Sequence, residues 1–242
     1  MMDDKIKKLN DIINNSERIV FFGGAGVSTE SGIPDFRSAT GLFNQDCFYK
    51  VEEVVSHSFL ANNPEFFFEF IFSKMVYKDA LPNECHKKLA ELEKAGKLKA
   101  IITQNVDGLH QKAGSKNVIE LHGTINKWHC KHCGKVYDLD NLPPHDPIPY
   151  CSCGGIIRPD VVLYQEPLNQ DDIKKAVEYI SNADTLIIGG TSLVVQPAAS
   201  LVRYFRGKHL IIMNKSYKDG DVACDVLIND SIGEAFKQVE IK

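Results

Sequence analysis

Short runs of apolar residues without polar alternation recur along the chain. They are rich in β-branched and aromatic residues, as in strands buried on both faces of a parallel sheet. The runs cover residues 18–22, 98–103, 185–190, 209–214 and 225–228. Segments with apolar residues at helical spacing accompany them, at 4–16, about 84–95, about 171–181 and about 197–206. This alternation predicts an α/β fold with a doubly wound parallel sheet covered by helices on both faces.

Two stretches depart from this pattern. Residues 36–75 have a helical, phenylalanine-rich pattern, and residues 125–160 are rich in Cys, Pro, Gly and His with short strands. We expect these two stretches to form a smaller domain, made of a helical module and an inserted metal ribbon. The larger domain would then be assembled from residues 1–35, 76–124 and 161–242.

Composition limits the classes of function. The chain of 242 residues is 43% hydrophobic and 25% charged, which suits a globular core. Its net charge of −4 argues against nucleic-acid binding, which normally uses a basic surface. No apolar stretch approaches the roughly 20 residues of a membrane span, and the N-terminus lacks the apolar region of a signal peptide. We therefore expect a cytoplasmic protein with no membrane or specific nucleic-acid partner. Composition does not give the oligomeric state, for which we expect a monomer.

Four of the seven cysteines cluster as Cys130-x-x-Cys133 and Cys151-x-Cys153. In a reducing compartment such pairs indicate a metal site rather than disulfides. The spacing suits a tetrahedral zinc site of four thiolates, which leaves no open position for catalysis. The alternatives are a rubredoxin-like iron site and thiols without a metal. We expect a structural zinc ion that holds the smaller domain together.

A glycine-rich turn, residues 23–28, follows the first apolar run. Glycines let the backbone approach a phosphate, and the N–H groups opening a following helix would face the anion. The same turn also occurs simply to pack a helix against a sheet. Thr29 replaces the third glycine of the usual dinucleotide fingerprint, and no acidic residue ends a second strand about 20 residues later. A dinucleotide would therefore be bound differently from that of a hydride-transfer dehydrogenase.

Polar residues gather where the predicted strands end. They lie at residues 35–37, 103–110, 121–123 and 190–192 and at Asn214. Each has a plain structural explanation: residues 104–108 as a turn, His122 as a core histidine, residues 190–192 as a helix N-cap. Ligands of open parallel sheets sit beyond the carboxyl ends of the strands, however, and all these segments recur there in order. Together they indicate a ligand site.

These segments resemble the sirtuin family of NAD-dependent protein-lysine deacylases. The matching parts are residues 24–37, 103–110, 121–123 and 190–197 and the four clustered cysteines. They span almost the whole chain in the family's order, as in a compact bacterial-type catalytic core. The resemblance implies a large Rossmann-like domain and a small zinc-plus-helices domain, with NAD and the acyl-lysine meeting in the cleft between them.

The resemblance also implies roles for individual residues. The NAD-binding residues would be Gly24, Ala25, Gly26, Thr29, Asp35, Phe36, Arg37, Gln104, Asn105, Val106, Asp107, His122, Thr191, Ser192, Asn214 and Ile232. Among them, residues 104–107 would form the pocket for nicotinamide and its ribose. Asn105 and His122 would be catalytic, with His122 as general base on the ribose hydroxyls, because its unperturbed pKa lies close to working pH. Phe36 would shield the reacting sugar from water.

The acyl-lysine peptide would lie as a strand between two segments of the chain. The implied substrate-binding residues are Val161, Leu163, Tyr164, Gln165 and Val194. The family usually has glycine where Gln165 stands, so this side chain would crowd or re-aim the peptide. Members that remove succinyl or malonyl groups use a Tyr and an Arg of the small domain, whereas no arginine lies between Arg37 and Arg158 here. We therefore expect neutral acyl groups, above all acetyl.

The implied products are nicotinamide, free lysine and O-acyl-ADP-ribose. Two other functions stay open at this point. The same pocket would serve an ADP-ribosyltransferase or NAD hydrolase, and a non-catalytic module could use it to sense NAD or ADP-ribose. A catalytic base such as His122 argues against the sensor, because sensing alone needs no base.

Overall fold

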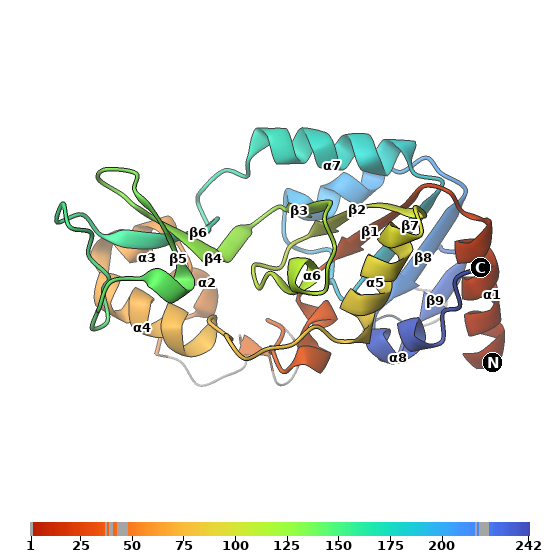
Figure 1. Cartoon of the computed structure of the whole chain (residues 1–242), viewed down its shortest axis with the longest axis horizontal. Helices are drawn as coiled ribbons and strands as arrows, with labels where there is room; N and C mark the ends of the chain where they lie inside the picture. Colours follow the sequence, from red (N-terminus) through yellow and green to blue (C-terminus); the bar gives the residue numbers. More distant parts are fainter. Residues whose placement is uncertain (1, 37, 39–40, 43–47, 216, 218–222) are drawn as a thin grey trace.

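The computed structural model describes residues 2–36, 38, 41–42, 48–215, 217 and 223–242. Figure 1 shows two parts beside each other along the longest axis. The larger part contains a parallel sheet with helices on both faces, and the smaller part contains a second sheet and three helices. Both chain termini lie at the end of the larger part that is remote from the smaller one.

The larger part is built on a six-stranded parallel sheet. Its strands are β1 (Ile19–Gly23), β2 (Leu98–Thr103), β3 (Val118–Glu120), β7 (Thr185–Gly189), β8 (His209–Met213) and β9 (Val226–Ile228). They are ordered β3-β2-β1-β7-β8-β9, with every neighbouring pair parallel. This is the strand order of doubly wound dinucleotide-binding folds. The direction of strand addition reverses between β1 and β7, and ligands of such sheets bind at that point.

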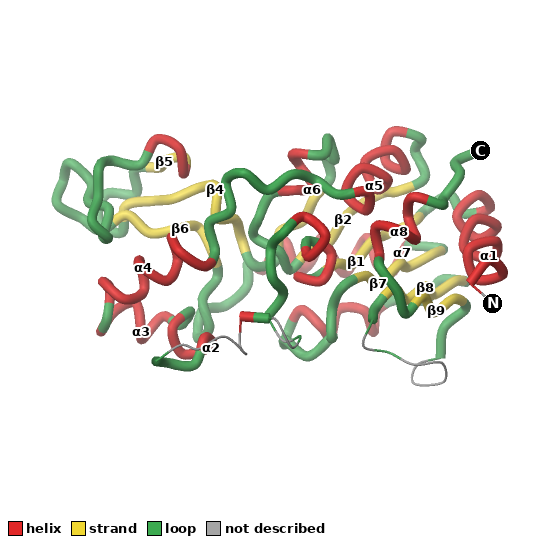
Figure 2. Tube along the Cα trace, turned by 90° about the horizontal axis from the view of Figure 1, so that it is seen from below, coloured by secondary structure: helices red, strands yellow, loops and turns green. Residues whose placement is uncertain are grey.

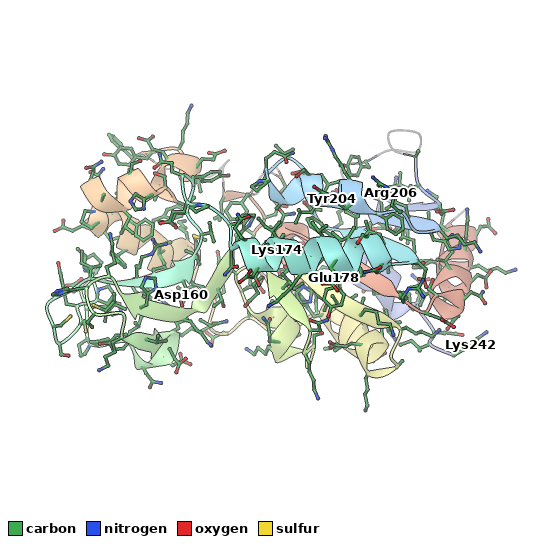
Figure 3. The ribbon with its side chains drawn as sticks, turned by 90° about the horizontal axis from the view of Figure 1, so that it is seen from above. Asp160, Lys174, Glu178, Tyr204, Arg206 and Lys242 are labelled. Carbon is green, nitrogen blue, oxygen red and sulfur yellow. The ribbon has the colours of Figure 1, made fainter. Side chains whose placement is uncertain are left out.

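Side chains of β1 alternate between the two faces of the sheet. Ile19 and Phe21 pack on one face against α1 (Met2–Asn15), α5 (Glu84–Lys94) and α8 (Ile232–Lys237). Val20 and Phe22 pack on the other face against α7 (Gln170–Asn182), the long helix at the top of Figure 1. Figure 3 looks onto α7, with Lys174 and Glu178 labelled on it. No helix in the described part of the chain is long and apolar enough to cross a membrane.

The predicted doubly wound sheet is confirmed, and each of the five apolar runs forms a strand. The sheet has one further strand, β3, that the apolar pattern does not predict. It has three residues, of which only Ile119 is buried, so it presents too short a run to be noticed. Its position beside β2 is nevertheless important, because His122 follows it.

The prediction of a helix directly after the glycine turn is wrong. Two 3₁₀ turns, Ala25–Val27 and Thr29–Ser31, take its place, and Gly32 ends the second with a left-handed φ of 83°. Pro34 follows two residues later and lacks an N–H to continue a helix. No long helix dipole therefore points at the ligand site from this turn, and any anion there would be bound by local backbone N–H groups.

The helix expected at 197–206 is also different in kind. Ala198–Tyr204 forms a 3₁₀ helix. A 3₁₀ helix has three residues per turn, so Ala198 and Leu201 lie on one face, and both are buried against the sheet. The tighter helix therefore buries the same apolar residues that suggested an α-helix.

The smaller part combines a three-stranded antiparallel sheet with three helices. The sheet has the order β5-β4-β6, with β4 (Gly123–Cys130), β5 (Val136–Asp138) and β6 (Ile157–Val161). The helices are α2 (Val51–Val54), α3 (His57–Asn62) and α4 (Pro64–Lys74), which lie under this sheet in Figure 2. Trp128 of β4 is fully buried, and its ring stacks on Phe72 with centroids 5.3 Å apart. The domain limits expected from the sequence stay a prediction.

Candidate active site

The backbone at the ends of β1 and β7 meets where the strand order reverses. Gly24 N–H donates to the carbonyl of Gly189 at 3.1 Å, and Gly26 N–H donates to the carbonyl of Gly190 at 2.8 Å. A Cβ on Gly26 would lie 2.8 Å from the Cα of Gly190, and a Cβ on Gly24 would lie 2.8 Å from the Cβ of Thr191. Glycine is therefore required here, and the surface of the crossing consists mainly of backbone.

This crossing suits the pyrophosphate of a dinucleotide. Ala25 and Ser192 both line a cavity of about 470 Å³. Their backbone N–H groups have no hydrogen-bond partner among the described residues. Backbone N–H groups beside glycines are a common way to bind phosphate oxygens. The residues present therefore fit NAD at this point of the fold.

The cavity brings together nearly all residues predicted from the sequence to bind NAD or peptide. Those that line it are Gly24, Ala25, Gly26, Thr29, Asp35, Phe36, Gln104, Asn105, Val106, Asp107, His122, Val161, Leu163, Tyr164, Gln165, Thr191, Ser192, Asn214 and Ile232. Val194 does not line it and is 60% exposed. Arg37 lies outside the described residues.

A hydrogen-bonded group of three side chains lies on one wall of the cavity. Ser28 Oγ donates to Asp107 Oδ2 at 2.7 Å and accepts from Asn105 Nδ2 at 3.1 Å. The other carboxylate oxygen of Asp107 accepts the N–H of Leu109 at 2.9 Å. Asn105 is 8% exposed, so its amide is held in one orientation by burial and by Ser28. Sequence reasoning did not assign a role to Ser28, whose partners are more than 70 residues away in the chain.

His122 lies after β3 with one ring nitrogen bound to the protein. Its Nδ1 lies 3.0 Å from the carbonyl oxygen of Gln104. Because a carbonyl only accepts, Nδ1 carries the proton and Nε2 is the nitrogen with a free lone pair. Burial lowers the pKa of His122, and the hydrogen bond to Gln104 offsets part of this change. The neutral ring therefore predominates at neutral pH, as a general base requires.

Hydrogen bonds also cross between the strand ends. Gln104 Nε2 donates to Thr191 Oγ1 at 3.1 Å, which joins the end of β2 to the end of β7. Asn214 Nδ2 donates to the carbonyl of Thr191 and so adds the end of β8. The three loops are therefore held in fixed relative positions before any ligand binds.

The predicted peptide-binding segment is anchored by a buried ion pair. Arg158 of β6 donates to both carboxylate oxygens of Glu166, at 2.6 and 3.1 Å, and to the carbonyl of Val161 at 2.7 Å. Burial alone would raise the pKa of Glu166, but bonds from Arg158, His57 and the N–H of Leu163 outweigh it and lower the pKa to about 2. Glu166 thus stays ionised and holds the segment against the smaller sheet.

The four clustered cysteines lie at the outer end of the smaller sheet. The Sγ atoms of Cys130 and Cys153 are 3.5 Å apart, those of Cys133 and Cys151 are 3.7 Å apart, and all four lie within 4.8 Å of one another. A tetrahedral zinc ion with Zn–S bonds of about 2.3 Å separates its sulfur atoms by roughly 3.8 Å. The four thiols therefore fit a structural zinc site, and their separation from the cavity gives the metal no place in the reaction.

Several cavity residues were missed by sequence reasoning. They are Ser28, Glu30, Lys74, Met75, Tyr77, Leu168, Met213 and Asp230. Lys74 lies at the end of α4 and Met213 in β8, and the others lie in a 3₁₀ turn or in loops, so no local pattern marks most of them. Asp230 lies two residues after the end of β9. The rule that ligands sit at the ends of parallel strands could have identified it as a site residue.

Two buried histidines lie behind the loop that carries Asp107. The ring centroids of His86 and His110 are 4.7 Å apart. Burial lowers the pKa of His86 to about 4, against a smaller opposing effect of Asp107 and Glu30. Burial, followed by the neighbouring His86, lowers the pKa of His110 to about 3. Both rings are therefore neutral in the folded protein.

We expect this burial to make stability fall in acid. A histidine in the unfolded chain takes up a proton near pH 6.5, whereas His110 in the folded chain does so only near pH 3, so the unfolded state gains protons as pH falls. In urea unfolding between pH 6 and 4, the free energy of unfolding of His110→Leu should depend less steeply on pH than that of wild type, by about 1.4 kcal/mol per pH unit. Equal slopes would show that His110 is not buried in the neutral form.

Comparison with known proteins agrees with the fold and the site. The model of the Sir2 family matches residues 24–197. The chain is 57% identical to the NAD-dependent protein deacetylase of Clostridium perfringens, over 98% of this chain and 99% of that protein. It is 43% identical to the NAD-dependent protein deacetylase of Staphylococcus epidermidis, over 99% of this chain and 98% of that protein.

Solved structures give the same result. A Sir2 homologue in complex with NAD superposes with a TM-score of 0.84 at 39% identity, covering 96% of this chain and 91% of that one. A complex of Sir2 with a p53 peptide and NAD⁺ superposes with a TM-score of 0.84 at 37% identity, covering 96% of both chains. The matched residues include the glycine crossing, the Ser28 group and His122, so the chain belongs to the Sir2 family, the sirtuins.

Proposed function

We propose that this chain is an NAD-dependent protein deacetylase, which transfers the acetyl group of an acetyl-lysine side chain to ADP-ribose. The products are nicotinamide, the free lysine and O-acetyl-ADP-ribose. The observation that carries the proposal is the meeting of the glycine crossing, the Ser28 group and His122 in one cavity. The relatives named NAD-dependent protein deacetylase over nearly their full length support the same reaction.

The proposed position of NAD follows the strand ends across the sheet. Its pyrophosphate would lie over the crossing of Gly24 and Gly26 with Gly190, whose surface is mainly backbone. Its adenosine would extend toward Asn214, directly after β8, and toward Ile232, the first residue of α8. Thr29, Asp35 and Phe36 also line the cavity, and Asp35 and Phe36 would belong to the loop that covers NAD.

The nicotinamide end would lie against the Ser28 group. The oxygens of Asp107 accept from Ser28 and Leu109, and each has a further lone pair for the carboxamide N–H₂ of nicotinamide. The Oδ1 atom of Asn105 has no partner among the described residues and is an acceptor for a ribose hydroxyl or a water. Because these groups are already held by hydrogen bonds, they need little reorganisation when nicotinamide leaves.

His122 would act as the general base. NAD, when bound, supplies a ribose carbon that accepts the acyl oxygen as nicotinamide leaves. The free Nε2 lone pair of His122 then takes a proton from a ribose hydroxyl, while the Gln104 carbonyl steadies the ring through Nδ1. Phe36, partly buried against the core of the smaller part and lining the cavity, would keep water from the reacting sugar.

The peptide substrate would pair with the segment from Val161 to Gln165. Val161 and Leu163 are buried and line the cavity, whereas Tyr164 is 39% exposed at its mouth. We propose neutral acyl groups, acetyl first, although Lys74 also lines the cavity. Faster removal of succinyl than of acetyl groups from the same peptide would contradict this preference. The monomeric state and the cytoplasmic location stay predictions.

The direct test is mass spectrometry of an acetyl-lysine peptide incubated with the protein, with and without NAD. We expect acetyl loss only with NAD, together with equal amounts of O-acetyl-ADP-ribose. Consumption of NAD without acetyl loss would instead indicate an ADP-ribosyltransferase or NAD hydrolase. Binding of NAD without any turnover would indicate a sensing module.

A further inference from the structure

The proposed peptide-binding segment is joined to the helical module along one edge. Tyr164 N–H donates to the carbonyl of Val55 at 2.9 Å, and its own carbonyl accepts the N–H of His57 at 3.0 Å. The next residue adds a side-chain bond, because Gln165 Oε1 accepts the N–H of Ser58 at 3.0 Å. We call this last bond the Gln165 latch.

The latch supplies one of the acceptors that the first N–H groups of α3 need. The first N–H groups of a helix lack partners within the helix and are satisfied by other groups. Here the carbonyl of Tyr164 accepts the N–H of His57, Gln165 accepts that of Ser58, and Ser56 Oγ accepts that of Phe59 at 3.2 Å. Two of these three acceptors come from the peptide-binding segment. Order in the segment and order at the start of α3 therefore depend on each other.

Gln165 also has a backbone conformation that a side chain disfavours. Its φ is 75°, in the left-handed region where glycine, and to a lesser extent asparagine, is favoured. The structure thus explains why a glycine would be expected at this position. The latch supplies a bond that holds glutamine in this conformation. It also directs the side chain toward Ser58, and the crowding of the peptide expected from the sequence stays a prediction.

The backbone of Gln165 is one part of the segment left for a peptide, beside the carbonyl of Val162. Leu163 donates its N–H to Glu166 Oε2 at 2.9 Å, and its carbonyl accepts the N–H of Glu166 at 3.0 Å. Tyr164 uses both of its backbone groups on the helical module. Among the described residues, the N–H and carbonyl of Gln165 have no such partner, and Gln165 lines the cavity. The side chain of the same residue accepts the latch bond from the N–H of Ser58.

We propose that Gln165 is a positioning residue for the peptide substrate, and this rests on the proposed deacetylase function. The latch holds the Gln165 backbone in the conformation that receives the substrate strand. Peptide binding then orders less of the protein, which improves affinity without changing the chemical step. The latch acts through Ser58 and touches neither NAD nor the reacting atoms.

Three variants at Gln165 distinguish the effect of losing the latch bond from the effect of strain at the left-handed φ. Gln165→Asn keeps a polar amide and tolerates the left-handed conformation, but it is one methylene too short to reach Ser58. Gln165→Gly removes the side chain and takes this φ without strain. Gln165→Glu keeps the length and an acceptor oxygen. Initial rates would be measured with an acetyl-lysine peptide at saturating NAD, together with the melting temperature of each variant.

We expect Gln165→Asn and Gln165→Gly to raise KM for the peptide about three- to tenfold, as when one more loop residue must be ordered on binding. Their kcat and their KM for NAD should stay within about twofold of wild type, and Gln165→Glu should restore the peptide KM. An unchanged or lowered peptide KM in Gln165→Asn and Gln165→Gly would overturn the proposal. A fall in kcat that follows the melting temperature in all three variants would also overturn it.

Failure of the proposed function would be visible separately, in wild type. If wild type does not deacetylate the peptide with NAD, the function is wrong and kinetics cannot address the latch. Amide hydrogen exchange at Ser58 would then test the latch bond directly. Protection of the Ser58 N–H should be lower in Gln165→Asn than in wild type and in Gln165→Glu, and equal protection in all three would show that there is no latch.

Discussion

We expect the His122→Ala variant to lower kcat for deacetylation about 10²–10⁴-fold, the usual effect of removing a general base. Among the described residues, His122 is the single histidine that lines the cavity, so no other imidazole can take its place. Its Nδ1 is bound to Gln104 and only Nε2 faces the reaction, so the loss should be chemical rather than structural. Rates with saturating peptide and NAD measure it, and a melting temperature close to that of wild type would show that the fold is kept.

The pH dependence of kcat/KM is a second test of His122 as the general base. Because burial lowers the pKa of His122, wild-type kcat/KM should fall with decreasing pH only below the usual histidine value of about 6.5, where the ring becomes protonated. This acidic limb should be missing in His122→Ala. His145→Ala is the matched control, since His145 is exposed and outside the cavity, and it should keep wild-type activity. An active His122→Ala enzyme would remove the base from this mechanism.

Removal of the metal should lower the melting temperature by about 10 °C or more, since a loss of about 4 kcal/mol has that effect in a chain of this size. Cys130 is 1% exposed and belongs to the same hydrophobic cluster as Phe67 and Trp128, so loss of the metal reaches the core of the smaller part. Strand β4 pairs with β6, which leads directly into the peptide-binding segment. Deacetylation should therefore be lost, although no metal takes part in it.

Scanning fluorimetry with a chelator, together with elemental analysis, would measure this effect. Readdition of zinc should restore both the melting temperature and activity. Cys151→Ser should behave like the chelated protein, whereas Cys224→Ser, a thiol outside the cluster, should melt close to wild type. Fully folded, active protein without any metal would show that the four thiols do not depend on zinc.

Much of the site could be predicted because its residues follow strands. Apolar runs without alternation mark buried parallel strands, and such strands all end at one edge of the sheet. Gly24, Asn105 and Asn214 could therefore be expected together although they are far apart in the chain, whereas His122 follows the unpredicted strand β3 and was assigned through the family resemblance. Four cysteines at short spacing likewise indicate their own chemistry, because two thiols on one tight turn can bind one ion.

Other features depend on neighbours that no local pattern reveals. Ser28 pairs with Asp107 and Asn105 only because β1 and β2 lie side by side. By contrast, the two 3₁₀ turns that replace the expected helix after the glycine turn are marked in the sequence itself by Gly32 and Pro34. The short strand β3 is found through its pairing with β2 rather than through its composition.

The sequence by itself determined the five apolar strands of the sheet, the glycines of the crossing and the four-cysteine cluster. These depend on periodicity and side-chain chemistry, which are local properties. Tertiary structure alone decided the bonds between distant segments: Ser28 on Asp107, Arg158 on Glu166 and Gln165 on Ser58. A polar side chain has many partners within reach in principle, and only packing of the chain selects the one that it meets.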